Sequence, residues 1–437
     1  MGAHAELLAR HRRVLPSWLS MYYDEPIELV SGHGCRVTDG EGREYLDFFG
    51  GILTTMTGYD VPEVVDAIRT QAGRMLHTST VYLIEPMVAL AERIASLSTI
   101  DGAKVFFVSS GTEATETALL LCCTARRSNQ VLALRNSYHG RSFTAMSVTG
   151  NRSWSASSLS PLSVSYVHSG YRYRSPWGHL PDADLTAACV DDLRNVIETT
   201  TAGDVACMIA EPVQGVGGFI VPPDGFLGAM KEVLDSHGIL FVSDEVQTGW
   251  GRTGENFWGF QAHGITPDLL TFAKGLGNGL AIGGVVGRGD LVESVEANSI
   301  STFGGNPLAS AGALANLEHL LSHDLQANAS KVGHHLLSRL GELVGKLDVL
   351  GDVRGKGLMI GVELVEPGGK TPSPRAASLV MEETKAAGLL VGKGGLYGNT
   401  LRIAPPLSVT MAEADQALEA LTAALEKADA TLSEEQS

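Results

Sequence analysis

Three polar clusters follow short apolar runs, at positions where the strands of an α/β sheet would end. The first is Ser110-Gly111-Thr112-Glu113, which precedes a helix-forming segment at 114–123. The first turn of a helix offers free N–H groups and the positive end of the helix dipole, and both favour a bound phosphate. Ser and Thr also precede helices as simple N-caps, so this cluster alone is a weak indication of a ligand.

Asp244 and Lys274 supply two further groups of different chemistry. Asp244 ends the apolar run 239–243 and precedes a glycine-punctuated loop, so a buried carboxylate there can keep a ligand's ring nitrogen protonated. Lys274 ends the run 269–273. A lysine taken singly is most often a solvated surface residue. A buried lysine is costly unless its amine is neutral or bonded to an aldehyde, which is how lysines form Schiff bases.

These groups match the three polar handles of pyridoxal phosphate, namely its phosphate, its ring nitrogen and its aldehyde. The carboxyl ends of parallel strands meet at one edge of a sheet, and ligands of open α/β sheets bind there. The combination therefore predicts a pyridoxal phosphate site with Lys274 and Asp244 as its catalytic residues.

The elements that must position these groups alternate between short strands and amphipathic helices. Strands are expected over residues 104–108, 130–134, 205–210, 239–243 and 269–273. Such alternation predicts an α/β fold whose large domain has a mostly parallel mixed sheet flanked by helices, with a smaller α+β domain beside it.

Three segments are expected along the chain. Residues 1–60 form an N-terminal segment that packs with the small domain, residues 61–308 form the large cofactor-binding domain, and residues 309–437 form the C-terminal small domain. Within the last segment we expect helices at 309–323, 327–347 and 411–428, a strand at 357–364, and a frayed acidic tail at 432–437.

Composition excludes several classes of partner. The net charge of −17 disfavours nucleic acid and membrane surfaces, which leaves small-molecule substrates. The five scattered cysteines form no disulfide or zinc pattern and favour a cytoplasmic location. We expect no metal, because the candidate histidines have no metal-ligand spacing; they are His33, His168, His179, His263 and His323.

Seven motifs occur in order along the chain: Ser110-Gly-Thr-Glu-Ala, Asn136-Ser-Tyr-His-Gly, Glu211-Pro-Val-Gln-Gly, Asp244-Glu-Val-Gln-Thr-Gly, Pro267-Asp-Leu-Leu-Thr-Phe-Ala-Lys-Gly, Ser301-Thr-Phe-Gly-Gly-Asn-Pro and Leu401-Arg-Ile-Ala-Pro-Pro. With them, residues 20–428 resemble the class III, fold type I pyridoxal phosphate aminotransferases. The segments His77-Thr-Ser-Thr-Val, Arg135-Asn-Ser-Tyr-His-Gly-Arg-Ser and Gly351-Asp-Val-Arg-Gly-Lys-Gly-Leu-Met-Ile-Gly are most similar, within that class, to the alanine:glyoxylate aminotransferase 2 type.

The resemblance implies a role for each matching residue. Lys274 carries the cofactor as a Schiff base, and Arg402 binds the substrate carboxylate. It also implies a homodimer in which Thr302 completes the neighbouring subunit's site, with a single dimer and a tetramer of two dimers both left open. The remaining cofactor contacts are phosphate ligands (Ser110, Gly111, Thr112), ring contacts (Tyr138, Asp244, Val246, Gln247) and supporting polar residues (His139, Glu211).

Two departures from relatives bear on the substrate. Val216 stands where ornithine and 4-aminobutyrate aminotransferases carry a glutamate that pairs with the carboxylate-binding arginine. Tyr59 and Asp60 alter a loop expected near the substrate mouth. The prediction is ping-pong transfer from an alanine-like or β-amino acid to glyoxylate or pyruvate. Alternatives are a decarboxylating transaminase of the dialkylglycine decarboxylase type, an ω-amine or diamine transaminase, or a catalytically idle dimeric scaffold.

Overall fold

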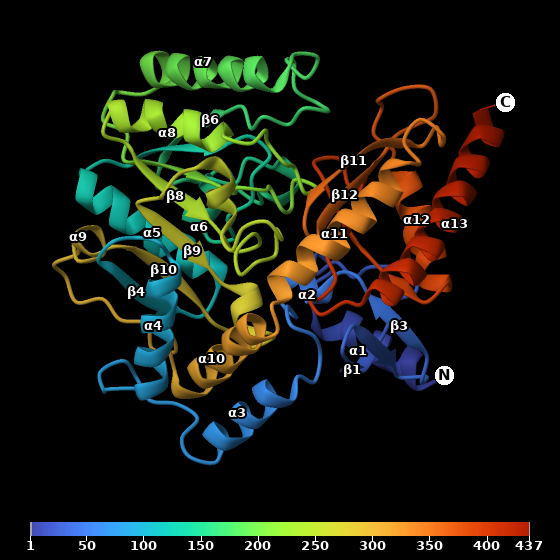
Figure 1. Ribbon diagram of the computed structural model, residues 1–437, viewed down its shortest axis with the longest axis horizontal. Helices are drawn as coiled ribbons and strands as arrows, with labels where there is room; N and C mark the ends of the chain where they lie inside the picture. The colour runs from blue at the N-terminus through green and yellow to red at the C-terminus, as the bar shows by residue number, and fades with distance from the viewer. Residues whose placement is uncertain (1, 437) are drawn as a thin grey trace.

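A seven-stranded sheet lies between helices in the left-hand part of the molecule in Figure 1, seen in a computed structural model that describes residues 2–436. From β6 to β9 the neighbouring strands are parallel, and β10 runs antiparallel to both β9 and β4. The predicted mostly parallel mixed sheet is therefore confirmed. In spatial order the strands are β4 (Ala103–Val108), β10 (Gly283–Arg288), β9 (Leu269–Phe272), β8 (Leu240–Asp244), β7 (Cys207–Ala210), β5 (Gln130–Leu134) and β6 (Ser163–Val167).

Helices cover both faces of this sheet, so its strands are apolar on both sides. In β5, Val131 and Ala133 pack toward α5 (Gly111–Arg126), whereas Leu132 and Leu134 pack toward α7 (Asp182–Thr200) and α8 (Phe226–Ser236). This alternation follows from the two-residue period of a strand. The carboxyl ends of the strands are thereby left as the polar edge of the large domain.

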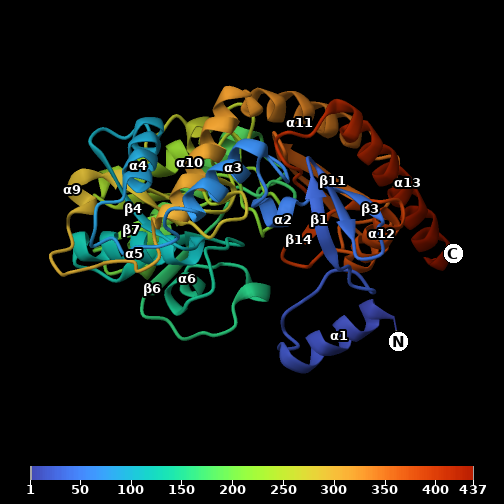
Figure 2. The same cartoon turned by 90° about the horizontal axis from the view of Figure 1, so that it is seen from below.

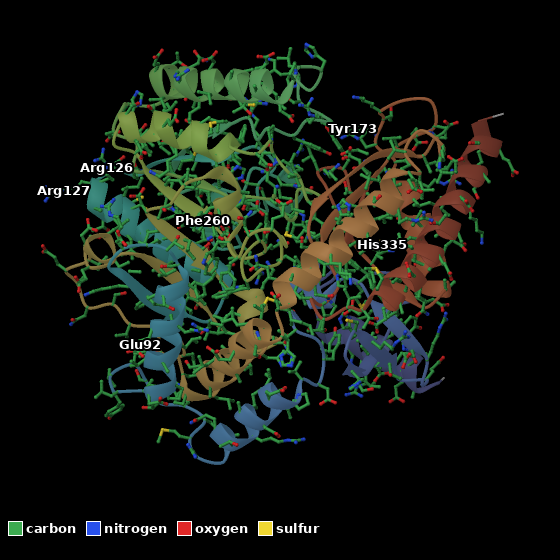
Figure 3. The ribbon with its side chains drawn as sticks, in the orientation of Figure 1. Glu92, Arg126, Arg127, Tyr173, Phe260 and His335 are labelled. Carbon is green, nitrogen blue, oxygen red and sulfur yellow. The ribbon has the colours of Figure 1, made fainter. Side chains whose placement is uncertain are left out.

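Helix α5 is oriented by its caps. Ser110 is the N-cap, and its hydroxyl accepts a hydrogen bond from the Glu113 amide at 3.2 Å. Arg127 is the C-cap in the left-handed region (φ 54°). Arg126 and Arg127 lie at the outer end of the helix (Figure 3), where cations complement the negative end of the dipole. The positive end therefore points into the molecule.

The N-terminal segment and the C-terminal part share a sheet. β1 (Leu29–His33), β2 (Arg36–Asp39) and β3 (Glu44–Asp47) form an antiparallel meander, and β13 (Leu389–Leu390) adds to β3 in parallel. Figure 2 shows these strands beside the C-terminal helices, with α1 set apart below them. The second four-stranded sheet comprises β11 (Leu350–Lys356), β12 (Met359–Leu364), β15 (Thr400–Ile403) and β14 (Gly392–Gly394).

Helix α10 (Pro307–Ser322) packs against α3 (Pro62–Ala72) and α4 (Glu85–Leu97), below the large sheet in Figure 1. Although the predicted small domain begins at residue 309, this helix contacts elements of the large one. The three-segment division stays a prediction.

The C-terminal helices differ from expectation at their ends. α11 is Leu325–Gly341 and stops before the predicted residue 347, and α13 is Met411–Gln436. For residues 432–436 the expectation of a frayed tail was wrong, because Leu432 is 3% exposed and Glu435 pairs with Arg375, whereas residue 437 lies outside the described residues. Burial and this ion pair extend the helix.

The remaining elements are short or peripheral. They are α1 (Ala3–Val14), α2 (Gly50–Leu53), α6 (Phe143–Ser147), α9 (Gly289–Val292), α12 (Pro374–Ala386), and the 3-10 turns Arg152–Trp154, Gly259–His263 and Lys274–Gly277.

No helix within residues 2–436 has the length and apolar character needed to cross a bilayer.

Candidate active site

A cavity of about 360 Å³ opens at the carboxyl edge of the large sheet. Ten of the predicted site residues line it, and Thr302 and Arg402 do not. The ten are Ser110, Gly111, Thr112, Tyr138, His139, Glu211, Asp244, Val246, Gln247 and Lys274; the other lining residues are Thr54, Ser109, Gly140, Ala273, Gly279, Leu280, Ala281 and Ile282.

One end of the cavity is the N-terminus of α5. The first-turn N–H groups of a helix have no partner within it, and the first-turn residues Gly111 and Thr112 line this end of the cavity. The backbone is packed so closely that a Cβ on Gly111 would lie 3.2 Å from the Val246 side chain, and one on Gly140 would lie 2.7 Å from the Thr112 hydroxyl. This end can hold a phosphate or another compact anion.

Asp244 ends β8 and is almost fully buried beside His139. The His139 Nδ1 lies 2.6 Å from Asp244 Oδ2, and Oδ1 accepts from the Val246 amide and the Thr271 hydroxyl, both at 3.1 Å. Burial alone lowers the pKa of His139, but the hydrogen bond and the negative charge of Asp244 outweigh it, so the net pKa is raised. These three contacts fix the orientation of the Asp244 carboxylate.

Lys274 is half-buried in the floor of the cavity. Burial lowers its pKa to about 8, against the opposing charges of Asp244 and Glu211. Its backbone is in the left-handed region (φ 44°), a conformation that costs free energy in a residue with a Cβ and persists only where its surroundings enforce it. A substantial fraction of the amine is therefore neutral near physiological pH and is nucleophilic.

Glu211 and Gln247 form the polar wall of the cavity. Glu211 follows β7, and its carboxylate accepts from the Tyr138 and Gly215 amides at 2.9 and 2.8 Å. Burial raises the Glu211 pKa to about 7. Among the described residues Gln247 Oε1 is buried without a hydrogen-bond partner, so the site has an acceptor available for a ligand's polar group.

Arg402 lies on β15 between two aromatic rings. Its guanidinium carbon is 4.8 Å from the ring centroid of Phe49 and 5.6 Å from that of Phe219, and its Nε donates to the Lys393 carbonyl at 3.3 Å. Nη1 is buried with no hydrogen-bond partner in residues 2–436. The interior position predicted for Arg402 is confirmed, and a donor is left free.

Thr302 lies on the exposed surface, in the loop before α10. Its neighbours Ile300 and Phe303 are also exposed, although both are large and apolar. Thr302 therefore does not contribute to the cavity of its own chain.

Sequence reasoning missed the network behind the Lys274 loop. The Asn316 side-chain amide donates to the carbonyls of Gly275 and Leu276 at 2.9 and 3.0 Å, and its oxygen accepts from the Thr57 hydroxyl at 2.6 Å. The Thr57 amide donates in turn to Asn278 at 3.1 Å. In the sequence, this hydrogen-bond network was indicated only by Asn316, a lone Asn inside an apolar helix.

Tyr59 and Asp60 do not line the cavity, contrary to their expected place at a substrate mouth. The Tyr59 hydroxyl donates to Asp47 at 2.6 Å, its backbone bridges Gly34 in both directions, and Asp60 lies 3.5 Å from His33. These contacts join the loop that precedes α3 to the N-terminal meander.

Comparison with known proteins decides the family. The family model described as aminotransferase class-III matches residues 21–425. The chain is a class III aminotransferase. It is 37% identical to the alanine–glyoxylate aminotransferase 2 homolog 2, mitochondrial, of Arabidopsis thaliana, over 96% of this chain and 87% of that protein.

Two further relatives support this assignment. The human alanine–glyoxylate aminotransferase 2, mitochondrial, is 35% identical over 96% of this chain and 86% of its own. The structure of an amine transaminase from an uncultivated Pseudomonas species, in its PLP-bound form, superimposes with a TM-score of 0.89 at 33% identity, covering 95% and 99% of the two chains. Because both alanine–glyoxylate relatives are named mitochondrial, the cytoplasmic location stays a prediction.

Pyridoxal phosphate is the cofactor of this aminotransferase, and the cavity suits each part of it. The α5 N-terminus suits the phosphate, the Asp244–His139 pair suits a protonated ring nitrogen, the free Gln247 oxygen suits a polar ring substituent, and Lys274 suits the aldehyde. These groups come from four separate strand ends of the sheet.

Proposed function

We propose that this aminotransferase moves an amino group from an alanine-like or β-amino acid to a short 2-oxo acid, glyoxylate or pyruvate, by a ping-pong mechanism. The observation that carries the substrate class is the buried guanidinium of Arg402, whose Nη1 has no hydrogen-bond partner among the described residues. A planar donor pair of this kind suits a carboxylate, which donors and acceptors of this class share.

The environment of Arg402 supports an unmasked carboxylate site. Val216 is buried, and its carbonyl accepts from the Gly395 amide at 2.9 Å. A Cβ on Gly394 would lie 3.0 Å from that same carbonyl and 2.9 Å from Arg402 Nε, so Val216 and Arg402 flank Gly394. With valine here, the guanidinium faces no acidic side chain from position 216 and stays available to both substrates.

The proposed roles of the chain's residues follow from their positions. The bound cofactor supplies an aldehyde and an electron-accepting ring. Lys274 holds it covalently and, once displaced by the donor amine, moves the proton from the donor's Cα. Asp244, oriented by His139, keeps the ring nitrogen protonated. The phosphate is bound by Ser110, Gly111 and Thr112. The ring is enclosed by Tyr138 and Val246, and its polar substituents are held by Gln247 and Glu211.

A panel of donors and acceptors on the purified holoenzyme tests the substrate class. We expect alanine and a β-amino acid to be the best donors, with glyoxylate or pyruvate as acceptor, and parallel lines in double-reciprocal plots. Carbon dioxide release from 2-aminoisobutyrate would instead indicate the decarboxylating alternative. A preference for 1-phenylethylamine over every amino acid would contradict the proposal.

An amine donor without a carboxylate is the second candidate. Arg402 does not line the cavity, and Phe49 and Phe219 cover its guanidinium with apolar surface. The Arg402→Ala variant distinguishes an enzyme that uses amino-acid donors from one that uses amine donors. For an amino-acid enzyme, kcat/KM for alanine falls by about 10²-fold, the loss of a charge-assisted bidentate contact; for an amine enzyme, the best donor is unaffected.

We further propose a homodimer in which Thr302 reaches the neighbouring subunit's phosphate site. Its exposure next to Ile300 and Phe303 supports this, since exposed apolar residues of this size favour an interface. Complementation tests it: Lys274→Ala and Thr302→Ala subunits, each defective alone, should form one fully competent site when mixed. Absence of recovered activity in a mixed dimer would contradict shared sites.

A further inference from the structure

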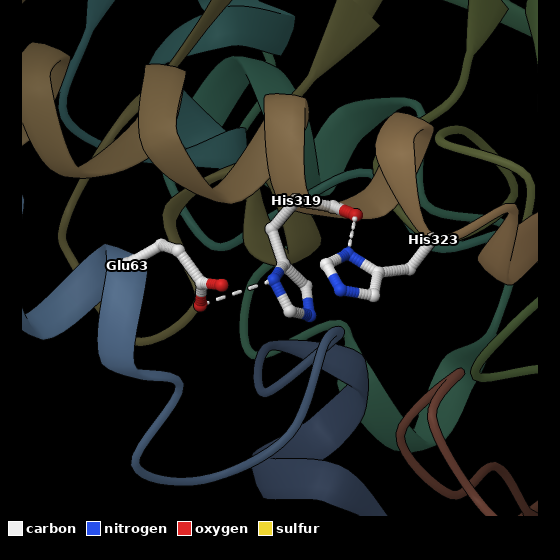
Figure 4. A group of neighbouring side chains, drawn as sticks. All are labelled: Glu63, His319 and His323. Carbon is white, nitrogen blue, oxygen red and sulfur yellow. Dashed lines mark hydrogen bonds and ion pairs between the residues drawn. The ribbon is translucent and has the colours of Figure 1, made fainter.

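Away from the cavity, three side chains of metal-ligand type meet between α3 and α10. Glu63 is in the first turn of α3, His319 is in the last turn of α10, and His323 is the residue that caps α10. Their donor atoms all lie within 4.8 Å of one another. Figure 4 shows the Glu63 carboxylate facing the His319 ring, with the His323 ring beside it.

The two imidazoles are held side by side by the helix. Residues four apart lie on one helical face, and the ring centroids of His319 and His323 are 4.1 Å apart. The His323 Nδ1 donates to the His319 carbonyl at 3.0 Å. This bond fixes the tautomer, so Nε2 of His323 keeps its lone pair free to bind a cation.

His319 directs its Nδ1 at the Glu63 carboxylate. The Nδ1 atom is buried and lies 3.3 Å from Glu63 Oε2, without the geometry of a hydrogen bond to any of the described residues. The Glu63 side chain is 57% exposed, so water can complete a coordination shell.

The spacing suits a divalent transition metal. Zinc–nitrogen and zinc–oxygen bonds of about 2.1 Å place tetrahedral ligands about 3.4 Å apart. The Glu63–His319 separation of 3.3 Å already has this value. The third donor needs only a small side-chain rotation, because both Glu63 and His323 are exposed.

We propose that Glu63, His319 and His323 bind one divalent transition-metal ion of the Zn²⁺ type, with water as a further ligand, and that this ion cross-links α3 to α10. The site revises the expectation of no metal. His319 and His323 alone give a helical pair, and Glu63 joins them only through the packing of two distant helices.

The cross-link is close to the Lys274 loop. Asn316, one turn before His319, holds that loop through the Gly275 and Leu276 carbonyls. α3 follows directly on the segment that contains Thr57, the other partner of Asn316. An ion between the helices therefore stabilises the scaffold behind the catalytic lysine without entering the cavity.

Zinc binding by the tag-free holoenzyme tests the proposal. After treatment with a chelator and its removal, ZnCl₂ is titrated by calorimetry in a buffer without phosphate, and bound zinc is counted by mass spectrometry of the metal. We expect one Zn²⁺ per chain and a higher Tm. His323→Gln and Glu63→Gln should weaken binding by about tenfold or more and abolish the Tm gain.

His334→Gln is the matched control, because it removes an exposed imidazole from α11 and should leave zinc binding unchanged. The Tm of each zinc-free variant shows that it is folded. Equal binding by wild type and His323→Gln places the zinc elsewhere and overturns the proposal, as does a wild type that binds none.

Discussion

The His139 imidazole donates from Nδ1 to Oδ2 of Asp244 at 2.6 Å, and both side chains are shielded from solvent. This bond fixes the orientation of the carboxylate at the end of β8. His139 is thus a positioning residue, since it acts on the cofactor through Asp244.

Replacing His139 by Gln should change how stability depends on pH. Because the folded-state pKa of His139 is raised above 6.5, the stabilisation is complete below that value and is lost as pH rises through the folded-state pKa. Each unit of difference between the folded-state and unfolded-state pKa of His139 contributes about 1.4 kcal/mol to the free energy of unfolding. Urea unfolding from about pH 6 to about pH 9 should show this decline in wild type and not in the variant.

The surface pair His335–Asp415, at 2.7 Å, provides the control. An exposed ion pair of this kind contributes little, so His335→Gln should keep the wild-type pH dependence. Identical profiles for wild type and His139→Gln would contradict the role assigned to the buried pair.

Lys274→Ala should remove covalent attachment of the cofactor and reduce turnover by about 10²–10⁴-fold, since proton transfer at Cα is lost. Borohydride reduction followed by mass spectrometry measures the attachment. Lys231, which pairs with Asp235 on the surface of α8 at 2.7 Å, is the control, and Lys231→Ala should retain the adduct at Lys274. An adduct surviving in Lys274→Ala would refute the assignment.

The rate of attachment should depend on pH in a defined direction. The neutral amine is the nucleophile, and the Lys274 pKa is lowered to about 8. When cofactor is added to the apoenzyme, the rate constant should therefore rise with pH until about 8 and then level off. A rise that continues to the ordinary lysine pKa of about 10.4 would show that the amine is not desolvated.

Val216→Glu should weaken amino-acid donors by masking Arg402. A carboxylate at this position lies within reach of the guanidinium, since both residues flank Gly394. We expect kcat/KM for alanine to fall by about 10–100-fold, the equivalent of one charged hydrogen bond. In the control variant Val216→Gln, the new side chain has the size of glutamate without its charge, so kcat/KM for alanine should fall less. Equal decreases in the two variants would indicate that steric blockage alone is responsible.

Asn316→Ala should impair both stability and catalysis. It removes two hydrogen bonds to buried carbonyls of the Lys274 loop, at a cost of about 2–4 kcal/mol. Asn328 makes two equivalent bonds, to the Leu407 and Val409 carbonyls at 2.7 and 2.9 Å. Asn328→Ala should cost similar stability yet leave kcat near wild type. Equal kcat values in the two variants would rule out a special role for Asn316.

Sequence alone predicted the parts of the site that follow directly on apolar strands. The Ser110 cluster, Asp244 and Lys274 each come just after a short apolar run, so the topology of a parallel sheet was enough to bring them together; Glu211 was found only through the family resemblance. β10 was not anticipated. Its sequence, Gly-Gly-Val-Val-Gly-Arg over Gly283–Arg288, is rich in glycine and is equally typical of a loop.

Contacts between distant segments could not be predicted in the same way. The Asp244–His139 bond, the Asn316 network and the meeting of Glu63 with His319 each depend on how two separate elements pack. Side-chain positions across such interfaces are set by shape and volume, which leave no periodic trace in the sequence. Tyr59 shows the opposite error, since an unusual residue near a motif serves only to anchor the meander.

The parallel pairing of β3 with β13 has a consequence for biosynthesis. Leu46 pairs with Leu389 and Asp47 with Leu390, so the first strands of the chain cannot complete their sheet until almost all of the protein has left the ribosome. The seven-stranded sheet uses residues 103–288 only and can form earlier. Assembly should therefore proceed from the middle outward, with the amino-terminal meander waiting as an unpaired edge that chaperones must shield.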